Sequence, residues 1–300
     1  MTLDQCEATF DAIRFASSSD SLTAAYRSLL TVYPVISFEL ARASTFWRGR
    51  KCESNRGYLG ASDLSYPPAK QCKTGRLNDE GSPCLYATQR KSTVFSELSL
   101  QDGDYVHVVG LRIKPAMGVR FIALGELFHV YKTGYMRTIG SDPDQTLSRL
   151  LNSHGLEEGK RILFIDAFFA ALLSDPNAKE NDYTLTRTLA SEAYKKIVGT
   201  EGLFYPSVQD HVGMCIAVHP TAYDTKMHIV CSQVIQISRV RAFGFFDYEV
   251  CFEAKGINDS GEFVWQKPAS RNAERFFGLT KEEVDLAQKR GRLGSNDNAI

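Results

Sequence analysis

The sequence has no excess of either charge and no apolar run long enough to cross a membrane. Lysine plus arginine and aspartate plus glutamate both number 35, so the formal net charge is zero. Because dedicated nucleic-acid-binding domains usually carry a basic excess, nucleic acid is not an expected partner. The most apolar stretch, residues 162–173, contains Asp166 and falls short of the ~20 residues that a transmembrane helix needs. It predicts a buried element of a globular protein, with no membrane partner.

Motifs for a disulfide framework or a metal site are also missing. Cysteine occurs seven times, an odd number, and no two cysteines form a C-x-x-C pair. Residues 1–14 carry acids and lack the apolar segment of a secretory signal, so we expect reduced thiols in a cytoplasmic protein. A loose group of metal-ligating residue types consists of His211, Cys215, His219, His228 and Cys231. Their spacings match no compact zinc motif, and we expect no metal.

Helical and strand-like segments are mixed along the 300 residues. Apolar residues at helical spacing predict two helices within residues 1–38, separated at Ser17–Asp20, and further helices over 141–152, 183–198 and 280–291. Segments rich in β-branched residues predict strands over 45–48, 105–113, 119–130 with a break at Gly125, 214–218, 227–240 and 243–253. This order predicts an α+β fold with mixed or antiparallel sheets and flanking helices.

Residues 75–97, with the sequence GRLNDEGSPCLYATQRKSTVFSE, contain the densest set of candidate functional residues. Arg76 is followed by turn-forming residues, and the apolar step at 84–86 then predicts a strand. From Ser92, N-cap chemistry predicts a short helix that carries Glu97 on its second turn. We therefore expect Arg76, Tyr86 and Glu97 to meet in one pocket.

The same run resembles the core signature of the RES domain, a family named for its arginine, glutamate and serine. The matching residues are Arg76, Asn78, Gly81, Leu85, Tyr86, Ala87 and Glu97. Two further matches come in the expected order, namely an arginine after aromatic residues at Phe46-Trp47-Arg48 and a Y-P-S step at Tyr205-Pro206-Ser207. Separated matches in the right order over residues 40–240 make the resemblance specific.

This resemblance implies a fold, a substrate and a partner. RES domains resemble diphtheria-toxin-type ADP-ribosyltransferases and consume NAD+, and many are toxins paired with an antitoxin. The resemblance thus implies an ADP-ribosyltransferase-like core, NAD+ as substrate without another cofactor, and an antitoxin or immunity protein as a candidate partner. On this basis we divide the chain into a helical leader at 1–38, a RES catalytic domain at 39–255 and a C-terminal helical extension at 256–300.

The resemblance also implies a role for each site residue. Glu97 would stabilise the positive charge that grows on the ribose as the bond to nicotinamide breaks. Arg48 and Arg76 would bind the pyrophosphate, and the Tyr86 ring would stack on nicotinamide. The Ser207 hydroxyl would bond a ribose, a phosphate or Glu97. Each residue has an ordinary alternative as well: a solvated glutamate, surface ion-pairing arginines, a core tyrosine and a loop serine.

Three classes of function stay open at this point. The first is an NAD+ glycohydrolase that uses water, or a phosphorylase that uses phosphate, acting as a toxin or effector. The second is an ADP-ribosyltransferase acting on a macromolecular target, and the third is a non-enzymatic NAD-binding module. Phe95 stands two residues before the glutamate, where many such transferases carry a second acid, and this argues against arginine-directed transfer. Asp79 and Glu80 replace the family's proline-rich turn and bring acids near a site meant for an anion.

Overall fold

One mixed sheet of ten strands runs through the described residues, which are 1–41, 45–137, 140–141 and 146–268 of this computed structural model. Its strands are β1 (Ile36–Leu40), β2 (Phe46–Cys52), β3 (Leu85–Thr88), β4 (Tyr105–Ile113), β5 (Val119–Ala123), β8 (Gly202–Pro206), β9 (Met214–Val218), β10 (Met227–Arg241), β11 (Phe245–Ile257) and β12 (Phe263–Gln266). Their order across the sheet is β1-β5-β8-β9-β3-β2-β4-β10-β11-β12. Within this sheet β5 and β8 pair in parallel, and the other neighbours pair antiparallel.

Eight α-helices accompany the sheet in the described part of the chain. They are α1 (Leu3–Arg14), α2 (Ser19–Val32), α3 (Lys91–Glu97), α4 (Glu126–Thr133), α5 (Thr146–Ser153), α6 (Leu156–Leu173), α7 (Thr184–Lys196) and α8 (Pro220–Lys226). Two short strands, β6 (Tyr135–Met136) and β7 (Gly140–Ser141), pair with each other. The α+β fold predicted from the sequence is therefore confirmed.

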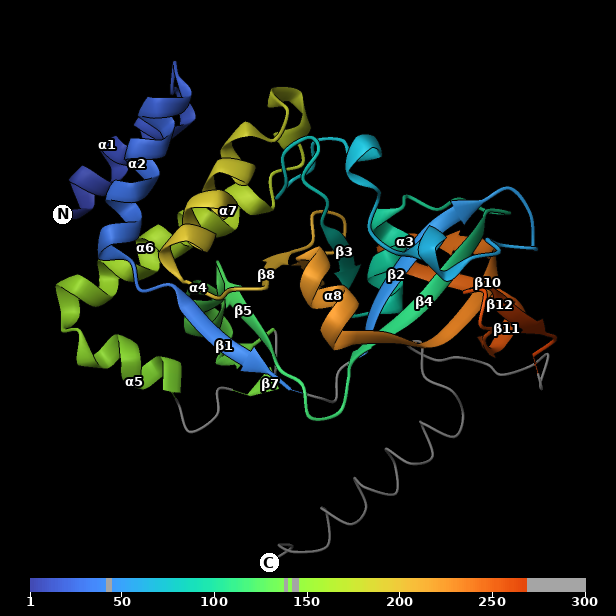
Figure 1. Cartoon of the computed structure of the whole chain (residues 1–300). Coiled ribbons are helices and arrows are strands. Elements are labelled where there is room, and N and C mark those ends of the chain that lie inside the picture. Colours follow the sequence, from blue (N-terminus) through green and yellow to red (C-terminus); the bar gives the residue numbers. More distant parts are fainter. Residues whose placement is uncertain (42–44, 138–139, 142–145, 269–300) are drawn as a thin grey trace, which may run out of the picture.

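Alternation along the strands sends side chains to apolar clusters on the two faces of the sheet. In β5, Ile122 joins the cluster that the helices share, whereas Phe121 joins the cluster on the opposite face. In β8, Leu203 and Phe204 divide between the two clusters in the same way. Helices α1, α2, α6 and α7 bury their apolar faces in the first cluster, and Figure 1 shows them gathered beside one half of the sheet.

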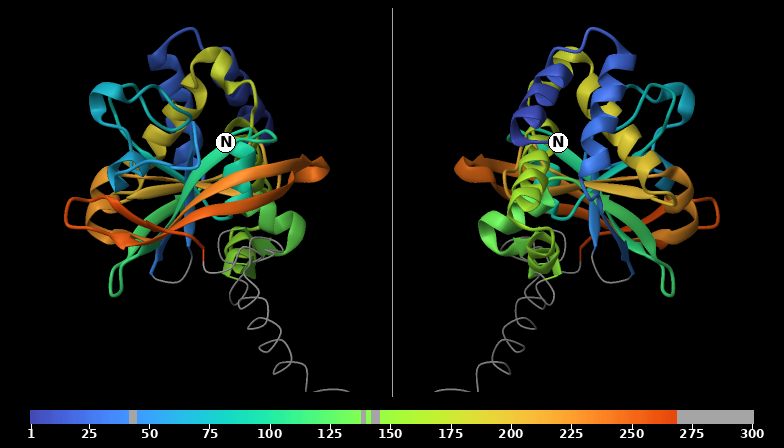
Figure 2. Two further views of the ribbon diagram at one scale, coloured as in Figure 1. Left: turned by 90° about the vertical axis from the view of Figure 1, so that its right-hand side faces the viewer. Right: turned by 90° about the vertical axis from the view of Figure 1, so that its left-hand side faces the viewer.

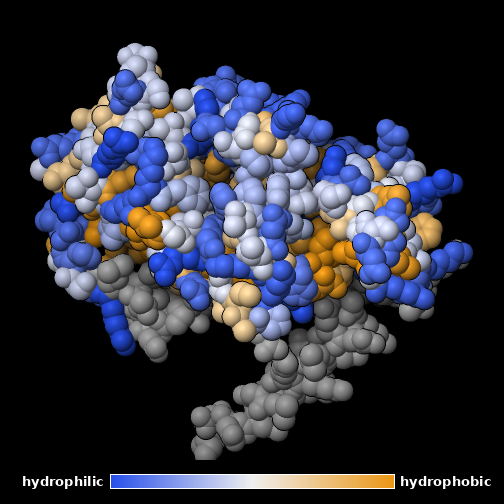
Figure 3. Space-filling model, viewed as in Figure 1, coloured by the Kyte–Doolittle hydropathy of each residue, from blue (hydrophilic) through white to orange (hydrophobic). Residues whose placement is uncertain are grey.

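The other half of the sheet extends away from these helices. The long hairpin of β10 and β11 projects past the rest of the sheet in the views of Figure 2. Helix α3 packs against this half through Val94 and Phe95, which join a third apolar cluster with residues of β4 and β10. The helix that carries Glu97 is thus anchored by buried apolar side chains. On the surface, polar side chains cover most of the face seen in Figure 3.

The segment 119–130 was predicted as strand with a break at Gly125, and the structure has strand only before that break. Strand β5 ends at Ala123, and helix α4 begins at Glu126 after Gly125, which adopts a φ of 81°. The buried carboxylate of Asp166 on α6 accepts the N–H groups of Gly125 at 2.8 Å and of Phe128 at 2.7 Å. It therefore satisfies the free N–H groups at the start of α4. Because this cap lies 41 positions from Gly125, the local sequence does not show it.

The ends of the chain agree with the predictions in part. The two helices expected within residues 1–38 are present as α1 and α2, and β1 then pairs with β5. Strand β12 was not expected, and it extends the sheet beyond β11. The helix predicted over 280–291 lies outside the described residues. The division into leader, catalytic domain and extension stays a prediction.

No helix among the described residues combines the length and apolar character needed to cross a bilayer. The seven cysteines, all within the described residues, form no disulfide. In the same part of the chain, no three His, Cys, Asp or Glu side chains are grouped as metal ligands.

Candidate active site

The sheet is loosely joined in its middle, between β2 and β3. These strands share a single registered pair, Trp47↔Thr88, whereas β2 pairs with β4 along its whole length. A cavity of about 560 Å³ lies here, and we call it the central cavity. Its walls consist of Trp47, Arg48, Gly49, Arg76, Tyr86, Ala87, Thr88, Val94, Glu97, Leu98, Pro176, Lys179, Tyr183, Tyr205, Val208, Gln209 and Cys215. Four of the five predicted site residues therefore line one cavity, and the fifth, Ser207, lies directly behind Glu97.

Helix α3 places Glu97 at this cavity as its last residue. The helix starts at Lys91 with Arg90 as N-cap, and not at Ser92 as predicted. Tertiary contacts fix this start, because the buried Lys91 ammonium bonds Gln233 at 2.7 Å and lies 4.3 Å from the centre of the Trp47 ring. The opposite strand permits close packing, since a Cβ on Gly49 would lie only 2.6 Å from Val94.

One oxygen of the Glu97 carboxylate receives every hydrogen bond that described residues make to this side chain. Oε1 accepts from the Ser207 hydroxyl, from the Val208 N–H at 3.2 Å and from the Cys215 thiol at 3.8 Å. Burial and the neighbouring carboxylate raise the pKa of the Cys215 thiol, so it stays protonated and acts as a donor. The Glu97 side chain is otherwise exposed to solvent. Its second oxygen, Oε2, is free to face a ligand in the cavity.

Ser207 links this carboxylate to the loop after β8. Its side chain is buried, its hydroxyl donates to Glu97, and its oxygen accepts the Asp210 N–H at 3.0 Å. Asp210 in turn accepts a hydrogen bond of 2.6 Å from the buried Thr93 hydroxyl. Because Thr93 and Glu97 are four residues apart, they lie on the same face of α3. The loop after β8 is thus held to α3 at two points.

Arg76 lies in a tight turn beside the cavity. The turn is closed by hydrogen bonds between Gly75 and Asn78, and Arg76 reaches across to the end of α6. Its Nη1 donates to the carbonyl oxygens of Leu173 at 3.0 Å and Asp175 at 3.1 Å. Carbonyl groups at a helix C-terminus lack helical partners and attract cations. These bonds hold one end of the guanidinium and leave Nε and Nη2 available to an anion.

Tyr86 holds this turn in place through hydrogen bonds of its hydroxyl group. Its hydroxyl accepts the Leu77 N–H at 2.9 Å and donates to Asn78 Oδ1 at 2.8 Å. Burial raises the pKa of the Tyr86 hydroxyl well above its ordinary value, so it remains a donor. The ring lines the cavity and meets Tyr205 edge to face at 6.4 Å between centroids. The predicted stacking on nicotinamide stays a prediction, and the structure adds a positioning role that depends on Asn78.

Arg48 bridges the gap between β2 and β3. Its Nη1 donates to the Tyr86 carbonyl and its Nη2 to the Ser65 carbonyl, each at 2.8 Å. Burial lowers the pKa of the guanidinium to about 10, which leaves it charged at neutral pH. Both Nη atoms thus hold the walls of the cavity together. The predicted contact of Arg48 with a pyrophosphate stays a prediction, and it would have to use the remaining Nη N–H groups, because Nε is buried.

The structure adds Tyr183 to the residues suggested by sequence. Its ring centre lies 5.4 Å from the Arg76 guanidinium carbon, within the range of cation–π attraction. Tyr183 and Asp182 both adopt a φ of 55°, and such left-handed residues cost on the order of 1–3 kcal/mol each. The predicted helix over 183–198 locates this segment, but nothing in its sequence signals the backbone conformation or the contact with Arg76.

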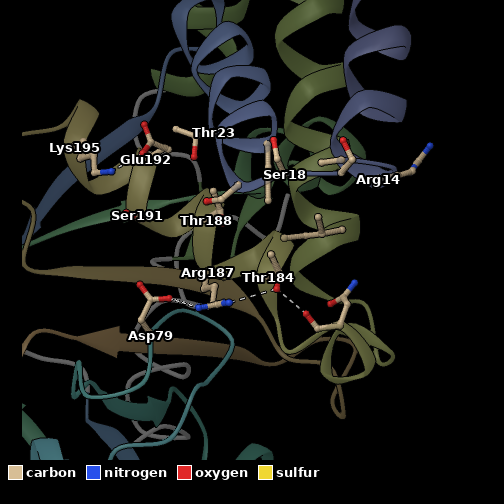
Figure 4. Close-up of a pocket in the computed structure, with 16 residues that line it drawn as sticks. Arg14, Ser18, Thr23, Asp79, Thr184, Arg187, Thr188, Ser191, Glu192 and Lys195 are labelled. Carbon is tan, nitrogen blue, oxygen red and sulfur yellow. Dashed lines mark hydrogen bonds and ion pairs between the residues drawn. The ribbon is translucent and has the colours of Figure 1, made fainter.

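The acids that replace the family's proline-rich turn are not directed into the central cavity, so they do not repel an anion there. Asp79 forms an ion pair with Arg187 of α7, and Glu80 is exposed. The pair faces a second cavity of about 570 Å³, which we call the helical cavity (Figure 4). This cavity lies between the α1–α2 turn and α7 and is lined by Arg14, Ala16, Ser17, Ser18, Ser19, Leu22, Thr23, Asp79, Asn181, Thr184, Leu185, Arg187, Thr188, Ser191, Glu192 and Lys195.

Comparison with known proteins identifies the family of this chain. A family model described as the RES domain matches residues 45–238, more than half of the chain. The chain therefore belongs to the RES domain family, which is generally a family of NAD-acting, toxin-type enzymes. No curated protein and no solved structure gives a significant match. The ADP-ribosyltransferase-like core thus stays a prediction.

Proposed function

We propose that this protein cleaves the bond between nicotinamide and ribose in NAD+, with water as the acceptor. The single observation that carries the proposal is the state of the Glu97 carboxylate at the central cavity. Its Oε1 is fixed by three donors, and its Oε2 has no hydrogen bond within the described residues. A carboxylate that is oriented in this way can stabilise positive charge developing at a ribose.

The chemistry of NAD+ fits such a site. When the bond between C1′ and the pyridinium nitrogen breaks, its electron pair goes to nicotinamide, which leaves as a neutral molecule. The ribose then carries an oxocarbenium charge, which a nearby carboxylate stabilises, as in glycosidases. Water adds at C1′ and releases one proton, so the products are ADP-ribose, nicotinamide and H⁺. Because no proton must be supplied to the leaving group, one carboxylate without a partner acid is sufficient.

The rest of the cavity supplies groups that suit the other parts of NAD+. Nε and Nη2 of Arg76 present two parallel donors, the geometry that binds phosphate oxygens in pairs. Lys179 adds a second cation to the same wall. Besides Tyr183, whose ring packs against Arg76, the aromatic rings that line the cavity belong to Trp47, Tyr86 and Tyr205. Such rings attract the charged pyridinium and provide faces on which heterocycles stack.

The lining of the cavity around Glu97 favours water over phosphate as acceptor. Trp47, Gly49, Val94 and Leu98 line the cavity with Glu97 and are uncharged. The one cation that β2 adds to this lining, Arg48, already donates through both Nη atoms to the carbonyls of Tyr86 and Ser65. On the other side, the loop after β8 contributes Val208 and Gln209. An incoming phosphate dianion would be repelled by the Glu97 carboxylate, because like charges at close range are costly. Water needs no such partner, and it reaches the solvent-exposed Glu97 directly.

Transfer of ADP-ribose to a protein arginine is less well supported. Phe95 occupies the position of the second acid, and its side chain is 1% exposed within the cluster that anchors α3. No acid on α3 is therefore placed beside Glu97 to activate an incoming guanidinium. The toxin-type character of the family supports a role as toxin or effector, in which loss of cellular NAD+ stops growth. An antitoxin or immunity protein that blocks the central cavity fits that role.

The test is incubation of the purified full chain with NAD+, with and without phosphate, followed by identification of both products. We expect free nicotinamide and ADP-ribose under both conditions. A phosphorylated ribose product formed only with phosphate would identify phosphate as the acceptor and overturn the choice of water. Binding of NAD+ without release of nicotinamide under either condition would leave a non-enzymatic module.

A further inference from the structure

The turn that carries Arg76 touches the first turn of α7 at two points. The Arg76 guanidinium carbon lies 5.4 Å from the centre of the Tyr183 ring, and Asp79 pairs with Arg187. These contacts face different cavities, because Tyr183 lines the central cavity and Arg187 lines the helical cavity. The two contacts can therefore be removed separately, and each has its own expected consequence for the substrate.

Arg76 needs a partner on the face of its guanidinium group. Its two bonds to the Leu173 and Asp175 carbonyls both involve Nη1 and lie at one end of the group. They leave the orientation of the guanidinium plane open, and an arginine side chain has much rotamer freedom to lose on binding. A ring packed against the face fixes that plane. Nε and Nη2 then stay aligned for a pyrophosphate.

The Tyr183 side chain makes few other contacts that would stabilise the fold. It belongs to none of the three apolar clusters, and its hydroxyl makes no hydrogen bond within the described residues. Its backbone adopts a φ of 55°, a conformation that asparagine or glycine accepts more readily than tyrosine. The contact with Arg76 is thus the main interaction that its aromatic side chain makes.

We propose that Tyr183 is a positioning residue that holds Arg76 in the orientation needed to bind the NAD+ pyrophosphate. This inference rests on the proposed function, because it requires a phosphate-bearing substrate in the central cavity. Tyr183 acts through Arg76 and lowers KM for NAD+. It leaves the rate of bond cleavage at Glu97 unchanged. The ring face performs this task, so phenylalanine can replace tyrosine.

The test is a double-mutant cycle with nicotinamide release as the readout. The variants are Tyr183→Asn and Tyr183→Phe, each alone and combined with Arg76→Ala, and a melting curve checks each fold. Asparagine removes the ring and tolerates the left-handed backbone, so the variant keeps the local structure. Arg187→Gln is the matched control, since it removes the other contact between the turn and α7.

The expected result separates KM from kcat. Tyr183→Asn should raise KM about three- to tenfold, which lies within the range from exposed to desolvated cation–π pairs, with kcat within about twofold. Tyr183→Phe and Arg187→Gln should stay within about twofold of the wild type in both constants. In the Arg76→Ala background, Tyr183→Asn should have no further effect, because its partner is absent.

Two results would overturn the inference while the wild type still releases nicotinamide. An unchanged KM in Tyr183→Asn would show that the ring does not position Arg76. An equal increase of KM in the presence and absence of Arg76 would show that Tyr183 contacts NAD+ directly or acts through the fold. If the wild type releases no nicotinamide, the proposed function fails first, and this inference falls with it.

Discussion

The two cavities are nearly equal in volume, at about 560 and 570 Å³, yet they differ in how much of their bonding capacity is already used. In the helical cavity, Arg187 pairs with Asp79 and Asp182, and Lys195 pairs with Glu192. In the central cavity, the hydrogen bonds that Arg76 makes to described residues go to backbone carbonyls, and those that Glu97 accepts from them all reach one oxygen. The two cavities are therefore distinguished by their charged groups and not by their volume. The candidate active site is the cavity whose cation and carboxylate are not paired with each other or with other charged groups among the described residues.

The two regions also differ in the elements that build them. The helical cavity lies between helix surfaces and is lined by serine and threonine hydroxyls and by charged side chains (Figure 4). The central cavity lies where a sheet is interrupted, and aromatic rings and a helix C-terminus form its walls. Rings and fixed backbone dipoles can hold a flat, charged ligand at little entropic cost. We therefore expect NAD+ to bind in the central cavity.

The largest effect is expected for Glu97→Gln. Glutamine keeps the size of the side chain but removes the charge that stabilises the oxocarbenium ion. Loss of such an oriented electrostatic contact costs about 2.7–4 kcal/mol, or about 10²–10³ in rate. NAD+ affinity and the melting temperature should change little, because the charge matters mainly in the transition state. Single-turnover release of nicotinamide, measured beside affinity and a melting curve, checks this.

In cells the same variant provides a second readout. If the wild type depletes NAD+ and stops growth, expression of Glu97→Gln should be tolerated. Turnover close to that of the wild type in a folded variant would show that Glu97 is not the catalytic carboxylate.

Arg76→Ala should have the next largest effect, on affinity and not on the chemical step. Loss of a paired hydrogen bond to a charged group costs roughly 1.5–3 kcal/mol, or about ten- to a hundredfold in NAD+ binding. Arg76→Lys should recover only part of this loss, because an ammonium group cannot offer two parallel donors. Titration with NAD+ measures both variants. Full recovery by lysine would show that the site needs only a charge.

Ser207→Ala should lower kcat by about tenfold, as expected for the loss of a hydrogen bond to a charged group worth about 1.5 kcal/mol. The Val208 N–H and the Cys215 thiol still reach Oε1 in this variant, so the orientation of Glu97 is weakened and not lost. Steady-state kinetics with a melting curve measure the change. Complete loss of activity in a folded variant would point to a direct chemical role for Ser207.

The smallest effect is expected for reversal of a single charge, and we compare one such variant in each cavity. Lys179→Glu places an acid on the wall beside Arg76 and should raise KM about two- to fivefold at low salt, because exposed charges contribute about 0.2–1 kcal/mol each. The increase should shrink at high salt. Lys195→Glu reverses a charge in the helical cavity and should leave KM unchanged. Equal changes in the two variants would remove the distinction between the cavities.

Local pattern was sufficient to predict much of the fold. Strand β4 coincides with the predicted strand at 105–113, because β-branched residues fill it and both faces are buried. Helices α1, α2 and α7 follow from apolar residues at helical spacing. The failures come from interactions between distant segments. The start of α4 depends on Asp166, and the start of α3 depends on the contact of Lys91 with Trp47.

The candidate site shows the same limit. Glu97 and Ser207 could be paired in advance because both fit a family signature, and the structure joins them by a hydrogen bond. The signature did not show that the Tyr86 hydroxyl supports the Arg76 turn or that Arg48 bridges two strands. Tyr183 could not be found from the sequence, since its contact with Arg76 spans 107 positions (from 76 to 183) and exists only in the folded chain.

A crystal structure of Glu97→Gln grown with NAD+ tests the central claim most directly, since the variant should bind the dinucleotide without cleaving it. The account predicts intact NAD+ in the central cavity, with its nicotinamide ribose beside the substituted side chain at position 97 and its pyrophosphate on Arg76. The helical cavity should hold no dinucleotide. NAD+ bound in the helical cavity, or in the central cavity with the ribose far from position 97, would contradict the account.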